Sequence, residues 1–248
     1  MAQGTPNLTS DPSAGYAELS SVAGLREFLA DFYSTRIATI TPMACHILEG
    51  KYGKSARAED KRAMRAAIRV LSGGAELFSV EIGRVFRHRF DAKLNPPLDA
   101  LSHTGRISIE ALTLMRQLGM QEEFELEECV SQIRKQCQTG LFELSVRLRK
   151  ILGRDTLPES HNPAFPRVFV RTLLDALSAI GCEGRSKQAT FQTFAPLLLG
   201  MAPDLYAQAN ALLIRTERGP SYELKFSAAG VSPINTNRHR SIMSIAST

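Results

Sequence analysis

Apolar side chains recur at steps of three and four residues along two long stretches of the chain. The first stretch comprises Leu126, Val130, Ile133, Cys137, Leu141, Leu144, Leu148 and Ile151. The second comprises Met64, Ile68, Leu71, Ala75, Phe78, Ile82 and Val85. This spacing keeps each set on one stripe of an α-helix, and such a stripe needs packing partners. We therefore expect an all-α fold: a bundle of about six helices, two of them long, with flexible N- and C-terminal tails.

The residue pattern divides the chain into three parts. Residues 1–20 are rich in Ser, Pro, Gly and Asn and are predicted to form a flexible leader. Residues 21–217 form the predicted helical domain, either as one unit or as a 21–97 helical pair followed by a 98–217 bundle. Residues 218–248 lose the large apolar side chains and are predicted to be a mostly disordered tail.

The apolar pattern also places the individual helices. They are predicted over residues 22–48, 58–94, 122–152, 164–180, 187–199 and 203–215. Pro42 should kink or break the first helix, because proline removes a helical hydrogen bond. A turn is expected at residues 50–53, and Gly73–Gly74 marks either close packing or a break in the second helix. Residues 105–118 fit both helical and strand spacing, which leaves their structure open.

The composition of the chain excludes several classes of protein. With 44% apolar residues, the chain is globular rather than disordered. No apolar run approaches the roughly 18 residues that span a bilayer, and the N-terminus lacks the basic and apolar segments of a signal peptide. We therefore expect a cytoplasmic protein with no membrane span. Its four cysteines fall mostly in apolar helical patterns, which is typical of reduced, buried thiols.

Positive charge gathers between residues 54 and 89, where nine Lys or Arg residues stand against four Asp or Glu. The candidate binding residues are Arg62, Arg65, Arg69, Arg84, Arg87 and Arg89. The first three share one helix face because they are spaced at steps of three and four residues. This basic face favours contact with nucleic acid, a signalling nucleotide or another acidic partner. The alternative is the solvated outer face of an amphipathic helix.

Negative charge gathers at residues 122–128, EEFELEE, where five of seven residues are acidic. They stand at the predicted N-terminus of the 122–152 helix. Negative charge there stabilises the helix dipole. A structural role is therefore the favoured interpretation of this segment.

Recognisable catalytic motifs are absent from the sequence. The five histidines have no metal-ligand spacing, and no nucleophile elbow, phosphate-binding loop or dinucleotide-binding motif occurs. An enzyme would need distant residues to converge, for example His88 or His161 with a carboxylate. We therefore predict no metal, no cofactor and no enzymatic activity.

Three motifs occur in a characteristic order. An acidic L-x-L segment leads into a long helix, NP-x-x-P-x-x-F-x-R follows over residues 162–171, and L-Y-x-x-x-N-x-L-L follows over 205–213. Across about residues 75–215 this order resembles an uncharacterised, mostly helical proteobacterial family, the domain of unknown function 1631, sometimes labelled thymidine phosphorylase. The resemblance implies a helical interaction or regulatory module and no known catalytic residue. Arg171 and Asn210 lie within the motifs as possible polar contacts, either between helices or with a ligand or partner.

These observations support a leading hypothesis and one alternative. The leading hypothesis is a non-enzymatic helical module that binds another protein or a second copy of itself. Its contact surface would be apolar area left over on the 58–94 or the 122–152 helix. The alternative is binding of nucleic acid or a signalling nucleotide through the basic face around residues 54–89.

Overall fold

The computed structural model describes residues 12–95 and 109–217, and all of their regular structure is helical. The helices are α1 (Pro12–Lys54), α2 (Ala58–Gly73), α3 (Ala75–Leu94), α4 (Ile109–Gln136), α5 (Gln138–Ile151), the 3-10 turn η1 (Glu159–His161), α6 (Pro166–Ala179) and α7 (Gly184–Glu217). The predicted all-α bundle is confirmed for these residues. The predicted tail over 218–248 lies outside the described residues, as do residues 1–11. Residues 12–20 of the predicted leader are the first turns of α1.

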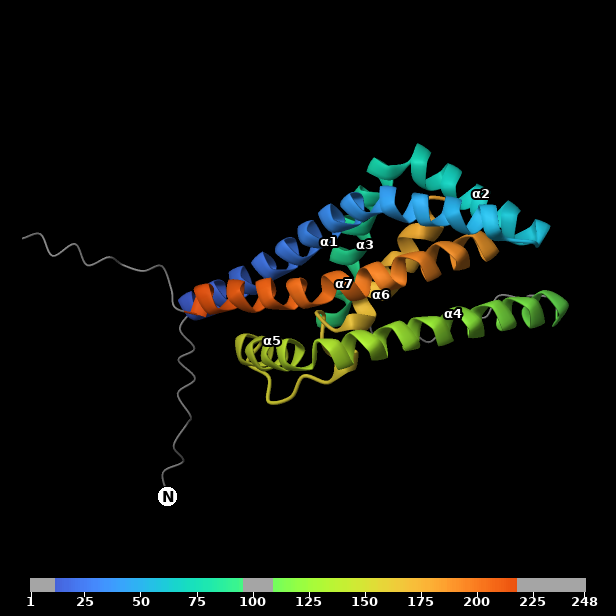
Figure 1. Ribbon diagram of the computed structural model, residues 1–248. Coiled ribbons are helices and arrows are strands. Elements are labelled where there is room, and N and C mark those ends of the chain that lie inside the picture. Colours follow the sequence, from blue (N-terminus) through green and yellow to red (C-terminus); the bar gives the residue numbers. More distant parts are fainter. Residues whose placement is uncertain (1–11, 96–108, 218–248) are drawn as a thin grey trace, which may run out of the picture.

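α7 is the central helix of the bundle and packs against α1, α2, α4, α5 and α6. Figure 1 shows α1 and α7 side by side along much of their length, with α4 and α5 below α7 in this view. α3 crosses the bundle and packs against both α1 and α6. The buried side chains form one apolar cluster that runs from Val22 in α1 to Leu213 in α7.

α7 is also the helix, among those described, that is long and apolar enough to cross a membrane, over Gly184–Arg215. By length and composition alone this is weak evidence for a membrane span, because the core helix of a bundle passes the same test. α7 contacts five other helices, and its central place accounts for its apolar sequence. The absence of a membrane span stays a prediction.

The apolar stripes predicted from the sequence face the core. Every member of the first stripe is buried except Ile151, which is half-buried at the helix end. The backbone leaves helical geometry for one residue at Cys137, so the predicted 122–152 helix is the pair α4 and α5. The predicted 58–94 helix is divided in the same way at Gly74, into α2 and α3. The glycine pair therefore marks a break between two helices.

Three prolines lie inside helices: Pro196 was expected there, whereas Pro203 was expected to begin a separate helix. α1 runs through Pro42 without a break, and α7 contains both Pro196 and Pro203. α1 continues to Lys54, so the predicted turn at residues 50–53 is wrong. α7 is one helix from Gly184 to Glu217, so its predicted division into two helices is also wrong. All three prolines are exposed. The carbonyl that each leaves without its helical partner can therefore be hydrated, while packing on the other face holds the helix together.

Aromatic side chains join four helices at the middle of the core. The Tyr33 ring from α1 packs edge-on against Phe169 of α6, with 5.5 Å between ring centroids, and its hydroxyl donates to the Phe169 carbonyl at 2.9 Å. Phe86 of α3 lies 4.9 Å from the same Phe169 ring. The hydroxyl of Tyr206 in α7 donates to the Ala164 carbonyl at 3.1 Å. Burial raises the pKa of both tyrosines well above the usual 10.0, so each remains a neutral donor.

Candidate functional site

The six arginines of the predicted basic face divide between two helices. Those from Arg62 to Arg69 lie on α2, and those from Arg84 to Arg89 lie on α3. Because Gly74 breaks the helix between them, the six do not share one continuous helix face. The two groups have different surroundings and are described separately.

The three α3 arginines are all paired with carboxylates. Arg84 donates to Glu81 on its own helix, with Nε 2.9 Å from Oε2. Arg87 reaches α1, where it contacts Glu27 at 2.7 Å and Asp31 at 2.8 Å. Arg89 reaches α6 and donates to Asp175 from both Nε and Nη2. Their charges are therefore largely offset, and the Arg87 and Arg89 pairs tie neighbouring helices together.

The α2 arginines face solvent. The Arg65 guanidinium lies 5.2 Å from the centroid of the Tyr52 ring and donates to the Tyr52 hydroxyl. The side chains of Arg62 and Arg69 are exposed and have no hydrogen-bond or ion-pair partner within residues 12–95 and 109–217. The uncompensated part of the predicted basic face is thus the outer surface of α2.

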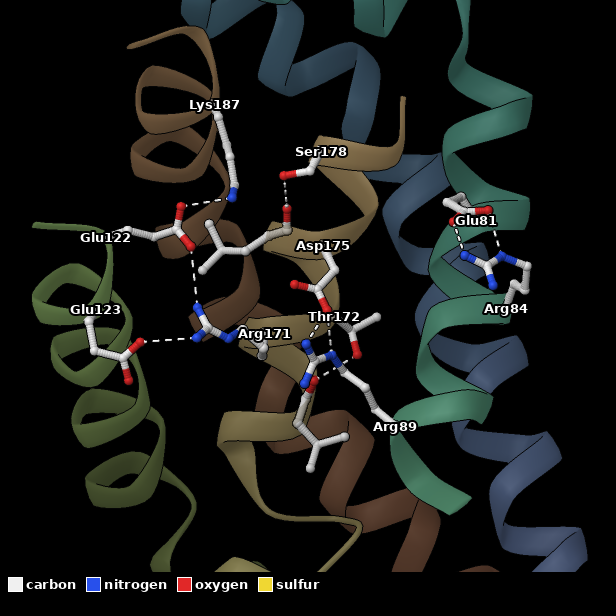
Figure 2. Close-up of polar contacts among 12 residues, drawn as sticks. Glu81, Arg84, Arg89, Glu122, Glu123, Arg171, Thr172, Asp175, Ser178 and Lys187 are labelled. Atoms are coloured by element: carbon white, nitrogen blue, oxygen red, sulfur yellow. Dashed lines mark hydrogen bonds and ion pairs between the residues drawn. The ribbon is translucent and has the colours of Figure 1, made fainter. Parts of the chain in front are cut away.

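Arg171 on α6 is held by the acidic segment of α4 (Figure 2). Its Nη1 lies 3.2 Å from Glu122 and its Nη2 lies 3.2 Å from Glu123. Lys187 of α7 contacts the other oxygen of Glu122 at 2.7 Å. Arg167, one turn before Arg171, pairs with Glu123 and Glu127. Arg171 therefore belongs to an ionic network that links three helices.

This network corrects the helix-dipole explanation of the acidic segment. α4 begins at Ile109, so residues 122–128 lie well inside the helix rather than at its N-terminus. The favourable field of a helix N-terminus is confined to the first turn. Residues 109–118, whose spacing fitted helix or strand, form the start of α4. The carboxylates at 122, 123 and 127 instead neutralise basic side chains of α6 and α7.

Asn210 of α7 is hydrogen-bonded to α5. Its amide nitrogen donates to the Gly140 carbonyl at 2.8 Å and to the Tyr206 carbonyl at 2.9 Å. Its amide oxygen accepts from Arg147 at 2.6 Å. A Cβ added at Gly140 would lie only 3.2 Å from the Cβ of Tyr206, so the glycine permits this approach. The hydrogen-bonding capacity of Asn210 is thus used within the bundle.

The four cysteines are all free, and three of them are buried. Burial raises the pKa of the Cys129 thiol to about 11, with a smaller contribution from Glu128. Burial also raises the pKa of Cys137. A thiol with a raised pKa holds little thiolate at neutral pH and is a poor nucleophile or metal ligand. In the part of the chain that the structure describes, no group of three His, Cys, Asp or Glu side chains could hold a metal ion.

The structure reveals a feature that the sequence did not predict, a groove between α4 and α7. It has a volume of about 510 Å³ and is hereafter called the α4–α7 groove. Its lining comprises Phe124, Glu125, Glu128, Cys129, Gln132, Phe191, Gln192, Ala195, Pro196 and Leu199. Phe124 is 70% exposed beside it, and Met120, one turn earlier, is 68% exposed. The sequence did contain one indication of this exposed side chain. Phe124 stands two residues before Leu126 and therefore does not share the buried face of the apolar stripe.

The two carboxylates of the α4–α7 groove, Glu125 and Glu128, have different partners from those of the ionic network. Glu125 accepts hydrogen bonds from the side-chain amides of Gln121, Gln188 and Gln192, at 2.8 to 2.9 Å. Glu128 accepts from the amide of Gln132 at 2.6 Å. No basic side chain of residues 12–95 or 109–217 forms an ion pair with either carboxylate. The groove therefore combines an apolar lining with two negative charges that remain uncompensated.

Two histidines of the sequence analysis come together in the structure. His88 and His161 line one hollow with Glu81 and Asp175, between α3, η1 and α6. The His161 Nδ1 lies 3.0 Å from the Ser160 hydroxyl. Among the described residues neither histidine of this hollow is hydrogen-bonded to a carboxylate, so the structure holds no assembled acid–base pair there.

The helices, their single apolar core and the central α7 define an all-α bundle, whose helices are also joined by partly exposed ion pairs. The chain belongs to the family described as "Protein of unknown function (DUF1631) N-terminal domain", whose model matches residues 23–217. The resemblance seen in the sequence motifs is thereby confirmed. No curated protein and no solved structure matches the chain.

Proposed function

We propose that this chain is a non-enzymatic, cytoplasmic module that binds another protein through the α4–α7 groove. The observation that carries the proposal is Phe124, a large aromatic side chain left 70% exposed at the edge of an apolar groove. Fully burying a side chain of this kind stabilises a complex by about 1.5–3 kcal/mol. Aromatic anchors that enter pockets dominate the energetics of protein interfaces.

The partner that fits this groove is an amphipathic helix. Phe191, Ala195 and Leu199 follow each other at four-residue steps along α7 and form the apolar wall. This row is about 12 Å long, since each helical residue rises about 1.5 Å. A helix that docks in a groove presents anchors at positions i, i+3 or i+4, and i+7, which cover a similar length.

The negative charge of the groove favours a partner helix whose polar face is basic. Glu125 and Glu128 have only amide partners, whereas the acids at 122, 123 and 127 of the same helix are paired with Arg or Lys. A cation on the partner would find two carboxylates free to form ion pairs. Charge complementarity of this kind raises specificity and association rate. We therefore infer a basic amphipathic helix of another protein as the occupant.

A fluorescent helical peptide of Leu and Lys tests this proposal directly. Its anisotropy is measured against the full chain, with a Leu and Glu peptide of the same pattern as the charge control. The basic peptide should bind and the acidic peptide should not. Phe124→Ala should weaken binding by about tenfold or more, which corresponds to about 1.4 kcal/mol.

Phe142→Ala is the matched control variant. Phe142 is 68% exposed, almost as much as Phe124, but lies on α5 and does not line the groove. It should leave the affinity within about twofold of the parent. Equal binding of the two peptides, or equal loss in the two variants, would overturn the proposal. A dimer in light scattering that Phe124→Ala dissociates would instead identify a second copy as the occupant.

A second candidate function rests on the outer surface of α2. Arg62 and Arg69 are exposed cations without partners among the described residues, and Arg65 lies between them. Nucleic acid or a signalling nucleotide would bind there through its phosphates, and the affinity would fall steeply with salt. Arg62→Glu and Arg69→Glu should then abolish binding to DNA, RNA or a cyclic dinucleotide at about 50 mM salt. Binding that survives both substitutions would remove this candidate.

A further inference from the structure

A hollow of about 590 Å³ lies between α3, η1 and the C-terminal half of α6, on the other side of α6 from the Arg171 network. It is hereafter called the α3–α6 hollow. Its lining comprises Glu81, Arg84, Val85, His88, Arg89, Ala92, Lys93, Ser160, His161, Asp175 and Ala179. The volume is within the range of about 300–1,000 Å³ that is typical of small-molecule sites.

The cations of this hollow exceed its anions. Its lining holds Arg84, Arg89 and Lys93 against two carboxylates, and each carboxylate is already bound by one arginine. The Lys93 ammonium donates to the Ser160 carbonyl at 2.8 Å, and no carboxylate of the described residues pairs with it. The hollow therefore carries one fixed positive charge without a counter-charge.

The titration of Lys93 agrees with this charge balance. Partial burial lowers the pKa of its ammonium, and repulsion from Arg167 and Arg89 lowers it further. The positive charge of Lys93 is thus held where other cations already raise the potential. The opposite charge of a bound anion would offset both the desolvation cost and the repulsion.

Two histidines complete the lining. His88 projects from α3 and His161 from η1, so the two imidazoles come from different walls. The Nδ1 of His161 is engaged with the Ser160 hydroxyl, and its Nε2 has no partner among residues 12–95 and 109–217. Imidazole, ammonium and guanidinium groups are the side chains that recognise phosphate oxygens.

From this cluster we propose that the α3–α6 hollow binds the phosphate group of a small phosphomonoester. Lys93 supplies the charge that has no counter-charge, Arg89 lies about one turn before it on α3, and the two histidines line the hollow from α3 and η1. The concave shape favours a small molecule over a nucleic-acid strand, whose phosphates need contacts along an extended surface. This inference is independent of the α4–α7 groove, which lies on other helices.

Calorimetric titration with glycerol phosphate tests the proposal, with chloride at the same ionic strength as the baseline. The full chain should bind with a dissociation constant below about 1 mM, or −4.1 kcal/mol. Lys93→Met keeps most of the aliphatic stem but removes the charge, and it should weaken binding by about tenfold or more. His88→Gln, on an exposed residue that does not tie helices together, should weaken binding by a smaller factor.

Arg62→Gln is the control, because it removes a cation from α2 and leaves the hollow intact. It should change the affinity by less than about twofold. Absence of binding at about 10 mM glycerol phosphate, or equal affinities of the parent and Lys93→Met, would overturn the proposal. Vesicles of phosphatidic acid form a further arm. Binding to these vesicles without binding to glycerol phosphate would contradict a soluble ligand and indicate a lipid headgroup.

Discussion

Leu144 provides the sharpest test of how the bundle is packed. It is completely buried in the middle of the α4–α5 stripe, and α5 packs there against α7. Leu144→Ala removes three carbon atoms, which at about 0.8 kcal/mol each amounts to about 2.4 kcal/mol of lost burial. The unfilled cavity adds to this loss, and such substitutions cost about 2–5 kcal/mol in total.

Urea denaturation followed by circular dichroism measures this loss. A domain has only about 5–15 kcal/mol of stability, so the midpoint should fall clearly below that of the parent. Phe142→Ala is the control, because Phe142 is two residues away on the same helix but 68% exposed. It should change the free energy of unfolding by less than about 0.5 kcal/mol. If Leu144→Ala unfolded like the parent, the stripe could not face the core and our account of the packing would be wrong.

Three further predictions concern polar and titratable groups. Asn210→Ala should lower the free energy of unfolding by about 1–3 kcal/mol, because the three hydrogen bonds of its amide group at the part-buried contact between α5 and α7 are lost; Gln208→Ala, on the exposed face of α7, should not. Because the pKa of Cys129 is about 11, its thiol should resist iodoacetamide at pH 8 in the folded chain and react in denaturant, as mass spectrometry would show. Rapid labelling without denaturant would contradict its burial. The hydrogen bond from Arg87 lowers the pKa of Glu27 below its usual 4.5, so this pair stabilises the fold above that pH and is lost as the pH falls through the lowered value. Glu27→Gln should therefore flatten the acid side of the stability profile, by less than about 1 kcal/mol because the pair is half exposed. A pH profile identical to that of the parent would refute this.

The apolar spacing was sufficient to predict the core of the fold. It placed the buried faces of α4 and α5 correctly because burial of an amphipathic stripe dominates helix packing. It also identified Gly73–Gly74 as a possible break. It failed where local and tertiary preferences compete. Pro42 and Pro203 disfavour a helix locally, yet α1 and α7 continue through them because their buried faces are packed and the proline faces are exposed.

The contacts of the charged residues could not be predicted from spacing. Arg62, Arg65 and Arg69 look like part of one basic face with the α3 arginines, but the partners of the latter, such as Asp31 and Asp175, lie far away in sequence. The acidic segment looked like a helix N-terminus because the preceding residues gave no clear helical signal. Only the three-dimensional arrangement separates carboxylates paired with α6 and α7 from those left free at the groove.

In-cell photocrosslinking tests the central claim most directly. A photoreactive residue replaces Gln192, which lines the α4–α7 groove, or Gln208, which is also exposed on α7 but lies outside the groove. The account predicts a discrete adduct from position 192 and none from position 208. The crosslinked segment should be a basic amphipathic helix of another protein. Adducts of equal yield from both positions, or an acidic crosslinked segment, would contradict the account.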